Sequence, residues 1–457
     1  MTSKRSDRGT LRVNKVRNGM TIHYPLASIS GQVTSVDKND QINSIAVIRD
    51  EILFKWTVSD GTFKCLVPLK IGRNSVAFET KNSFPLTLDI DLIYRPHKEN
   101  ERFIRILYVV CRDQWGGIFE RGCFQSLPDQ DNSMKLAQQK ISLAILMLQT
   151  FMGETTPSHY SFRTETGQNG MPKVHVFTIE KTQNELWSLS QQDLWKLVAE
   201  NVLASKLANQ NCKFLAFCSF SRYVCDRFVN SEISSDEIKK MTKGYVALGG
   251  GGLALLSSAC FYSWPATIDQ IESCFTNTRS IDRSLLMDDS GGSGTFGGCY
   301  SNTLGALAHE IGHIFDLGHS KFGIMSSAYR DIEKFFLASK DFVLDGGTKW
   351  WSRSASLLLT NHKWFNGHQD SLEDAFRLTD TTLRSRYGVM VIEYRESSGL
   401  GVRFKEYFLP AKWVKLEIHP DDCSLIAMDI KGNIFRRDVT NSIPSMYARP
   451  QHVIPMA

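Results

Sequence analysis

Long apolar runs are missing from this sequence of 457 residues. The longest candidate for a membrane helix, 248–264, is broken by four consecutive glycines, and nowhere do about 18 uncharged apolar residues follow one another, so we expect no transmembrane segment. The first 19 residues lack the apolar core of a secretory signal and carry six basic residues against one acidic residue, which predicts a basic flexible tail over 1–19. These absences favour a cytoplasmic, intracellular protein that does not bind a membrane.

An excess of charge of one sign is missing as well. Lys and Arg total 53 against 48 Asp and Glu, a net charge of only +5, so nucleic acid is not an expected partner. The ten cysteines include no Cys-x-x-Cys pair, and several stand in apolar strand-like runs, which indicates reduced thiols rather than a disulfide framework. With 42% hydrophobic and 22% charged residues, the chain has the composition of a folded protein, and its length allows about two to four domains.

Short alternating runs dominate residues 20–96. Apolar and polar side chains alternate there between clusters of turn residues, which predicts a β-sandwich. The order of Pro25, 29–33, 60–63 and 69–76 resembles the small immunoglobulin-like modules that accompany many hydrolases. The resemblance implies an immunoglobulin-like β-sandwich over 20–96.

Strands and helices alternate after residue 96. Three predicted strands enclose two predicted helices, an order that favours a parallel-dominated sheet in an α/β domain over 97–370. From 371 to 457 strand patterns return and predict a small C-terminal β module. The expected strands of the α/β domain are 102–110, 173–179 and 213–220, and its first two helices are 132–152 and 191–209.

The motif with the clearest chemistry lies in residues 301–320. His309 and His313 are four residues apart on a predicted helix, so both imidazoles project from one face and can meet one cation. Glu310 can reach a water on that cation, and His319 can return a third imidazole if the chain turns after the helix. Three neutral nitrogens leave one tetrahedral position of Zn²⁺ open for water, as in catalytic zinc sites, and a carboxylate beside that water implies hydrolysis.

This motif resembles the long zinc-binding consensus of the metzincins, HExxHxxGxxH, and the whole chain is similar to a little-characterised group of intracellular eukaryotic zinc metallopeptidases in that clan. The resemblance implies a metzincin-like α/β (α+β) catalytic domain with a mixed sheet and a zinc-binding helix. It implies that Glu310 is the general base and that Met325 belongs to the methionine-containing turn beneath the metal. One catalytic Zn²⁺ is implied, with the ligands His309, His313 and His319.

One position departs from the consensus. Asp316 stands where the family has the Gly that turns the chain out of the helix, but Asp tolerates positive φ better than most residues and Gly318 follows two positions later. The alternative is a thermolysin-like site, whose third ligand is a Glu at least about twenty residues beyond the second His. Glu333 lies twenty residues after His313, so both His319 and Glu333 stay open as the third ligand, with His319 favoured.

A run of four glycines, 249–252, precedes an apolar segment. Such a run can expose the backbone of an edge strand with which an extended peptide substrate pairs, although a flexible loop or tight packing explains it equally well. The residues of this possible substrate-binding strand are Gly250, Gly251, Leu253 and Ala254.

Together these features predict a zinc-dependent metalloendopeptidase. We expect a zinc-bound water, activated by Glu310, to hydrolyse a peptide or protein substrate. The alternative is a catalytically silent zinc-binding scaffold that acts through its two β modules. The intact Glu310 argues against that alternative, because loss of the general base is the usual mark of an inactive relative.

Overall fold

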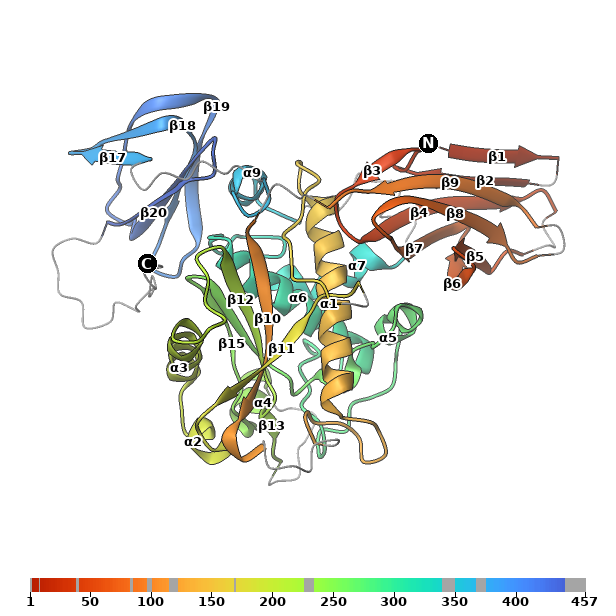
Figure 1. Cartoon of the computed structure of the whole chain (residues 1–457), viewed down its shortest axis with the longest axis horizontal. Coiled ribbons are helices and arrows are strands. Elements are labelled where there is room, and N and C mark those ends of the chain that lie inside the picture. The colour runs from red at the N-terminus through yellow and green to blue at the C-terminus, as the bar shows by residue number, and fades with distance from the viewer. Residues whose placement is uncertain are drawn as a thin grey trace.

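Three larger β-sheets, one after another along the chain, organise the fold (Figure 1). The computed structural model describes residues 2–7, 9–37, 41–82, 85–96, 101–114, 122–167, 170–225, 234–338, 350–366 and 375–439. One apolar core cluster contains side chains from all three sheets and from the helices α1 and α6. The sheets are therefore packed together through shared apolar side chains.

The N-terminal sheet has nine strands in the order β1-β2-β4-β7-β6-β5-β8-β9-β3. All its neighbours are antiparallel except β3 and β9. The predicted β-rich segment 20–96 is thus confirmed as strands, whereas its immunoglobulin-like character stays a prediction. The strands are β1 Thr2–Ser6, β2 Gly9–Asn14, β3 Met20–Ile22, β4 Leu26–Ser35, β5 Ser44–Arg49, β6 Ile52–Ser59, β7 Thr62–Pro68, β8 Gly72–Thr80 and β9 Thr87–Tyr94.

The prediction of a flexible tail over 1–19 is wrong. Residues of this segment form β1 and β2, and β2 pairs along its length with β4. Leu11 and Val13 have no exposed surface, while the alternate residues Thr10 and Arg12 are partly exposed. Two apolar residues at period two are enough to place a strand on a core when a neighbouring strand is available, and the surrounding basic residues hide that pattern in the sequence.

The central sheet has the order β11-β10-β12-β16-β15. Its first four strands are parallel, and the edge strand β15 is antiparallel to β16, which confirms the predicted mixed sheet. Alternate residues of β10 enter two different core clusters, one shared with α1 and α6 and one shared with α2 and α3, so helices cover both faces (Figure 1). The strands are β10 Phe103–Cys111, β11 Val174–Ile179, β12 Cys212–Cys218, β15 Ala247–Gly250 and β16 Leu253–Ser257.

The C-terminal sheet has the order β17-β18-β20-β21, with β19 paired to β18. Its strand β18 faces two ways: Val391 belongs to the large core, whereas Ile392 belongs to a small apolar cluster within this sheet. The predicted boundary at 370–371 falls outside the described residues. The strands are β17 Phe376–Thr379, β18 Thr382–Arg395, β19 Gly401–Lys415, β20 Ser424–Asp429 and β21 Ile434–Asp438.

Helices fill the space around the central sheet. The helices predicted over 132–152 and 191–209 correspond to α1 and α3, the second of which ends earlier than expected. None of the described helices combines the length and the apolar composition needed to cross a bilayer. The helices are α1 Met134–Thr155, α2 Gln183–Trp187, α3 Gln191–Leu203, α4 Ser235–Met241, α5 Ile271–Phe275, α6 Phe296–Ile314, α7 Glu333–Phe336 and α9 Arg353–Asn361, and a short ribbon joins β13 Arg222–Tyr223 to β14 Thr242–Lys243.

A buried lysine joins the N-terminal sheet to the region around the central sheet. Lys64 on β7 donates a hydrogen bond from Nζ to the carbonyl of Phe335 on α7, and Nζ lies 4.2 Å from the centre of the Phe335 ring. Burial lowers the pKa of Lys64 from 10.5 to about 7. The unfolded chain therefore binds the proton of Lys64 more tightly than the folded chain does.

This difference predicts a pH dependence of stability. Between about pH 7 and 10.5, Lys64 is protonated in the unfolded chain and largely neutral in the folded one, so its burial costs less free energy as pH rises. The free energy of unfolding should gain up to about 1.4 kcal/mol per pH unit from this residue. Lys64→Met should lose that gain when urea denaturation is compared at pH 7 and pH 9.

The control is Lys70→Met, which changes a lysine that lies between β7 and β8 and whose side chain is 65% exposed. It should keep the pH dependence of the unaltered chain. An equal slope in Lys64→Met and Lys70→Met would contradict the expected effect of the buried lysine.

Candidate metal centre

Helix α6 supplies the first two candidate ligands. Thr295 caps its start by accepting a hydrogen bond from the backbone N–H of Gly298 at 3.1 Å. Leu304, Leu307 and Ile311 are fully buried along the helix, and this apolar face holds α6 in the large core. The helix thus has a fixed rotation, and His309 and His313 project from it toward the same point.

The three predicted ligands come together in the structure. The candidate ligand atoms of His309, His313 and His319 lie within 4.8 Å of one another, and the two Nε2 atoms of His309 and His313 are 3.0 Å apart. Each ring also contacts a backbone carbonyl through Nδ1. The distances are 2.8 Å from His309 to Ile324, 2.9 Å from His313 to Leu317 and 2.9 Å from His319 to Ser398.

These contacts fix the protonation pattern of the rings. A carbonyl oxygen can only accept, so in a neutral ring Nδ1 carries the proton and Nε2 carries a lone pair. Burial lowers the pKa of His309 to about 4 and that of His313 to about 3, which keeps both rings neutral. Two lone pairs 3.0 Å apart repel unless a cation lies between them.

The arrangement fits a zinc ion. Tetrahedral Zn²⁺ binds imidazole nitrogens at about 2.0–2.1 Å, which places two such nitrogens about 3.3 Å apart, close to the observed spacing. Donation of the second ring nitrogen to a carbonyl is also the usual support of a metal-binding histidine. Among the described residues, these three histidines are the group of His, Cys, Asp and Glu side chains that could hold a metal.

Glu310 is on α6, and its side chain lies against the edge strand β15 of the central sheet. Its side chain is buried, and burial raises its pKa to about 7, an effect that the backbone N–H of Gly249 partly opposes by hydrogen bonding to the carboxylate. A β-carbon at Gly249 would lie 2.4 Å from the carbonyl oxygen of Glu310 and 2.9 Å from its Oε2. Glycine at 249 therefore lets β15 approach the carboxylate, a role that only the glycine run in the sequence hints at.

Asp316 provides the turn that the consensus assigns to glycine. Its φ is 66°, so it adopts the left-handed conformation expected from the sequence. Its carboxylate accepts hydrogen bonds from Arg436 and contacts His362 Nε2 at 3.5 Å. Burial alone would raise the pKa of Asp316, but Arg436, His362 and the buried Lys213 outweigh that effect and hold it well below the usual range.

The two candidates for the third ligand lie in different places. His319 reaches the other two histidines, as described above. Glu333, the first residue of α7, instead accepts a hydrogen bond from the hydroxyl of Ser301 on α6. The geometry therefore favours His319, and the departure at Asp316 does not displace it.

Met325 packs against helix α6. It is 1% exposed, and its carbonyl accepts a hydrogen bond from the N–H of Ser320 at 2.8 Å. Its sulfur packs against Gly312, one residue before His313. The assignment of Met325 to a methionine-containing turn beneath a metal stays a prediction.

The predicted edge strand is only partly correct. Gly250 lies in the edge strand β15, but Gly251 forms the hairpin turn with a φ of 57°. Leu253 and Ala254 are in β16, whose backbone pairs with β12 on one side and with β15 on the other. The assignment of Leu253 and Ala254 to the edge strand is wrong. The positive φ of Gly251 and Gly252 reverses the chain before these two residues, which therefore lie in the next strand inward.

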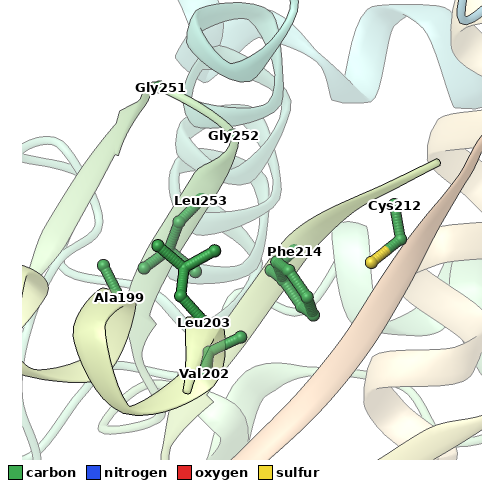
Figure 2. A pocket seen from close by; sticks show the side chains of 8 residues that line it. All are labelled: Ala199, Val202, Leu203, Cys212, Phe214, Gly251, Gly252 and Leu253. Atoms are coloured by element: carbon green, nitrogen blue, oxygen red, sulfur yellow. The ribbon is translucent and has the colours of Figure 1, made fainter. Parts of the chain in front are cut away.

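A small apolar pocket lies on the opposite face of the sheet from α6. Figure 2 shows that its side chains come from α3 and from the ends of β12 and β16. No described lining side chain is a base or a metal ligand other than the thiol of Cys212, so we do not assign chemistry to it. It is lined by Ala199, Val202, Leu203, Cys212, Phe214, Gly251, Gly252 and Leu253.

Comparison with known proteins places these observations in context. A family model described as "Putative peptidase family" (Metallopep) matches residues 10–387. A protein of Saccharomyces cerevisiae named "Putative zinc metalloproteinase" is 26% identical over 317 residues, which cover 63% of this chain and 43% of the yeast protein. One of Schizosaccharomyces pombe with the same designation is 23% identical over 319 residues, covering 64% and 48%. The chain thus matches less than half the length of these relatives.

Solved structures give a weaker likeness. The crystal structure of wild-type OgpA from Akkermansia muciniphila aligns with a TM-score of 0.42 and 14% sequence identity. The alignment covers 74% of this chain and 92% of OgpA.

The contact between Gly249 and Glu310 yields a stability prediction. Gly249→Ala places a β-carbon against the backbone and carboxylate of Glu310, so it should lower the free energy of unfolding by about 1–3 kcal/mol. Gly250→Ala is the matched control, since a β-carbon at that neighbouring position meets no atom within 4 Å. Equal losses in the two variants, measured by urea denaturation, would show that β15 and Glu310 are not in close contact.

Proposed function

We propose that this chain, which belongs to the putative peptidase family whose model it matches, is a zinc-dependent metallopeptidase that cleaves peptide bonds within its substrate. One observation carries the proposal. Three imidazoles, each tied through Nδ1 to a carbonyl, bring their candidate ligand atoms within 4.8 Å of one another, and the buried Glu310 directly follows the first of them in the sequence. His309, His313 and His319 would hold one Zn²⁺ there.

The chemistry divides between the metal and the protein. A bound zinc ion supplies Lewis acidity, which polarises a carbonyl and lowers the pKa of water to about 7. Glu310 acts as the general base, removes a proton from the attacking water and later gives it to the leaving amine. Burial raises the pKa of Glu310 to about 7 in the metal-free chain, which makes the carboxylate a stronger base, and the charge of a bound zinc ion would lower that pKa.

The edge strand supports the choice of an extended peptide as substrate. Among the described strands, β15 pairs only with β16; on its other side the N–H of Ala247 donates to Gln191 and that of Gly249 to the Glu310 carboxylate, so a peptide pairing with this edge would replace those two hydrogen bonds. Gly249 brings this strand against Glu310. A peptide added along Ala247–Gly250 would therefore run past the proposed base, with chain continuing in both directions, as endopeptidase cleavage requires.

Replacing the base separates catalysis from metal binding. Glu310→Gln keeps the size of the side chain but cannot accept the proton, so the hydrolysis rate should fall by at least about 10²-fold. Zinc content should stay at one ion per chain, because Glu310 is not among the candidate ligands. The measurement is cleavage of a peptide library together with metal analysis of the same preparation.

Glu333→Gln is the control, because Glu333 is a partly buried carboxylate near α6 that lies outside the histidine group. It should cleave as the unaltered chain does. Full activity in Glu310→Gln would refute the mechanism, and a chain that binds zinc yet cleaves no peptide would point to a silent scaffold.

The identity of the third ligand is tested by zinc affinity. His319→Ala removes an imidazole whose Nε2 faces the other two, so we expect the dissociation constant for Zn²⁺ to rise at least about 10-fold. Glu333→Gln should leave it unchanged. The opposite result, with zinc lost only from Glu333→Gln, would restore the thermolysin-like alternative.

A further inference from the structure

The third histidine is held by a different part of the chain from the first two. His309 and His313 sit on α6, and their Nδ1 atoms contact Ile324 and Leu317, which lie close to them in the sequence. His319 instead pairs with the loop 396–400, which joins β18 to β19 in the C-terminal sheet. The position of this ligand therefore depends on residues about eighty positions away.

Three hydrogen bonds make this connection. The backbone N–H of His319 donates to the carbonyl of Gly399, and the N–H of Gly401 donates to the carbonyl of His319, both at 2.9 Å. The ring Nδ1 contacts the carbonyl of Ser398, also at 2.9 Å. The loop and Gly401, the first residue of β19, thus satisfy both backbone groups of His319 and one ring nitrogen, which leaves Nε2 for the metal.

The loop itself is held in one shape. The N–H of Gly399 donates to the carbonyl of Glu396 at 2.9 Å, and the N–H of Glu396 donates to the carbonyl of Leu400 at 3.1 Å. The hydroxyl of Ser398 donates to the carboxylate of Glu396 at 2.7 Å and accepts from the N–H of Leu400 at 3.2 Å. These four hydrogen bonds within the loop define its shape next to His319.

Two arginines of the same sheet hold the turn that leads to His319. Arg395, the last residue of β18, donates from Nη2 to the carbonyl of Asp316 at 2.5 Å, and its Nε donates to the buried Glu393 at 2.8 Å. Arg436 on β21 forms an ion pair with the carboxylate of Asp316, with its Nε at 3.0 Å from Oδ1. The turn 316–319 is consequently fixed at both ends by the C-terminal sheet.

We infer that Arg436, Arg395 and the loop 396–400 are positioning residues for the third metal ligand, so that the C-terminal sheet completes the metal centre. This inference rests on the proposed function. It gives the C-terminal sheet a role in metal binding, and it explains why a carboxylate stands at 316 where glycine would suffice for the turn. The sheet needs no contact with substrate to have this role.

The experiment compares zinc affinities of the full chain and its variants. Metal-free protein is titrated with Zn²⁺ against a competing chromophoric chelator. Arg436→Gln removes the ion pair with Asp316 and should weaken zinc binding by about 10–100-fold, the usual effect of losing a partner that supports a ligand. Arg436→Lys keeps the charge but loses the two-point contact, so its zinc affinity should lie between that of Arg436→Gln and that of the unaltered chain.

The matched control is Arg353→Gln. Arg353 on α9 also forms an ion pair with the C-terminal sheet, through Glu406 on β19, and its side chain is 55% exposed against 46% for Arg436. It does not touch the turn 316–319. Its removal should change zinc affinity by less than about twofold.

A second variant disturbs the contact without removing a charge. In Gly318→Ala, the new β-carbon would lie 2.6 Å from Arg395 Nε and 2.7 Å from the carbonyl of Gly399, so it should push the loop away from His319 and weaken zinc binding. Co²⁺ in place of zinc provides an independent readout, because its visible absorption reports the number of ligands. Both Arg436→Gln and Gly318→Ala should shift that spectrum toward the one given by His319→Ala.

The outcomes are distinct. If the zinc affinities of Arg436→Gln and Gly318→Ala stay within about twofold of that of the unaltered chain, the inference is overturned. It is also overturned if Arg353→Gln loses as much zinc affinity as Arg436→Gln, because that result would reveal a general effect of destabilising the sheet. Thermal unfolding of each variant shows whether it is folded at the temperature of the titration. If the unaltered chain itself binds no zinc, the proposed function fails, and the inference fails with it.

Discussion

The hydrogen bonds from three imidazole Nδ1 atoms to three backbone carbonyls are the interaction on which this site depends. Each bond selects the tautomer whose Nε2 carries a lone pair, and each fixes the direction of that lone pair. Without them, two neutral rings at 3.0 Å could rotate and share a proton instead of offering two lone pairs to a cation. The carbonyls come from Leu317, Ile324 and Ser398, so the backbone around the site matters as much as the ligands.

Burial has opposite effects on the two kinds of group in the site, and both effects favour metal chemistry. It lowers the pKa of His309 and His313, which keeps their rings neutral, and it raises the pKa of Glu310 to about 7. A more exposed helix would give a fully ionised glutamate and more basic histidines. The apolar face of α6 and the close approach of β15 therefore determine the chemistry as well as the packing.

The sequence predicts those features of the site that depend on short distances along the chain. The spacing of His309, Glu310 and His313 on one helix is local, and the mixed order of strands and helices follows from hydrophobic periodicity. The strand at Leu11 and Val13 was hidden because two apolar residues among basic ones give a weak pattern. The glycine run does not reveal a hairpin, because the turn depends on the positive φ of Gly251 and Gly252. For this reason the sequence assigns residues of β16 to the edge strand, which is in fact β15.

The role of Asp316 could not be predicted from the sequence, because its partner Arg436 lies 120 positions away. A glycine at 316 would adopt positive φ without the strain of about 1–2 kcal/mol that other residues bear there. It would, however, remove the carboxylate that pairs with Arg436 and lies near the buried Lys213, and leaving a buried charge uncompensated costs more than that strain. Aspartate is thus the residue that satisfies both the turn and the C-terminal sheet. The ion pair between Asp316 and Arg436 thus links the turn that carries His319 to the C-terminal sheet.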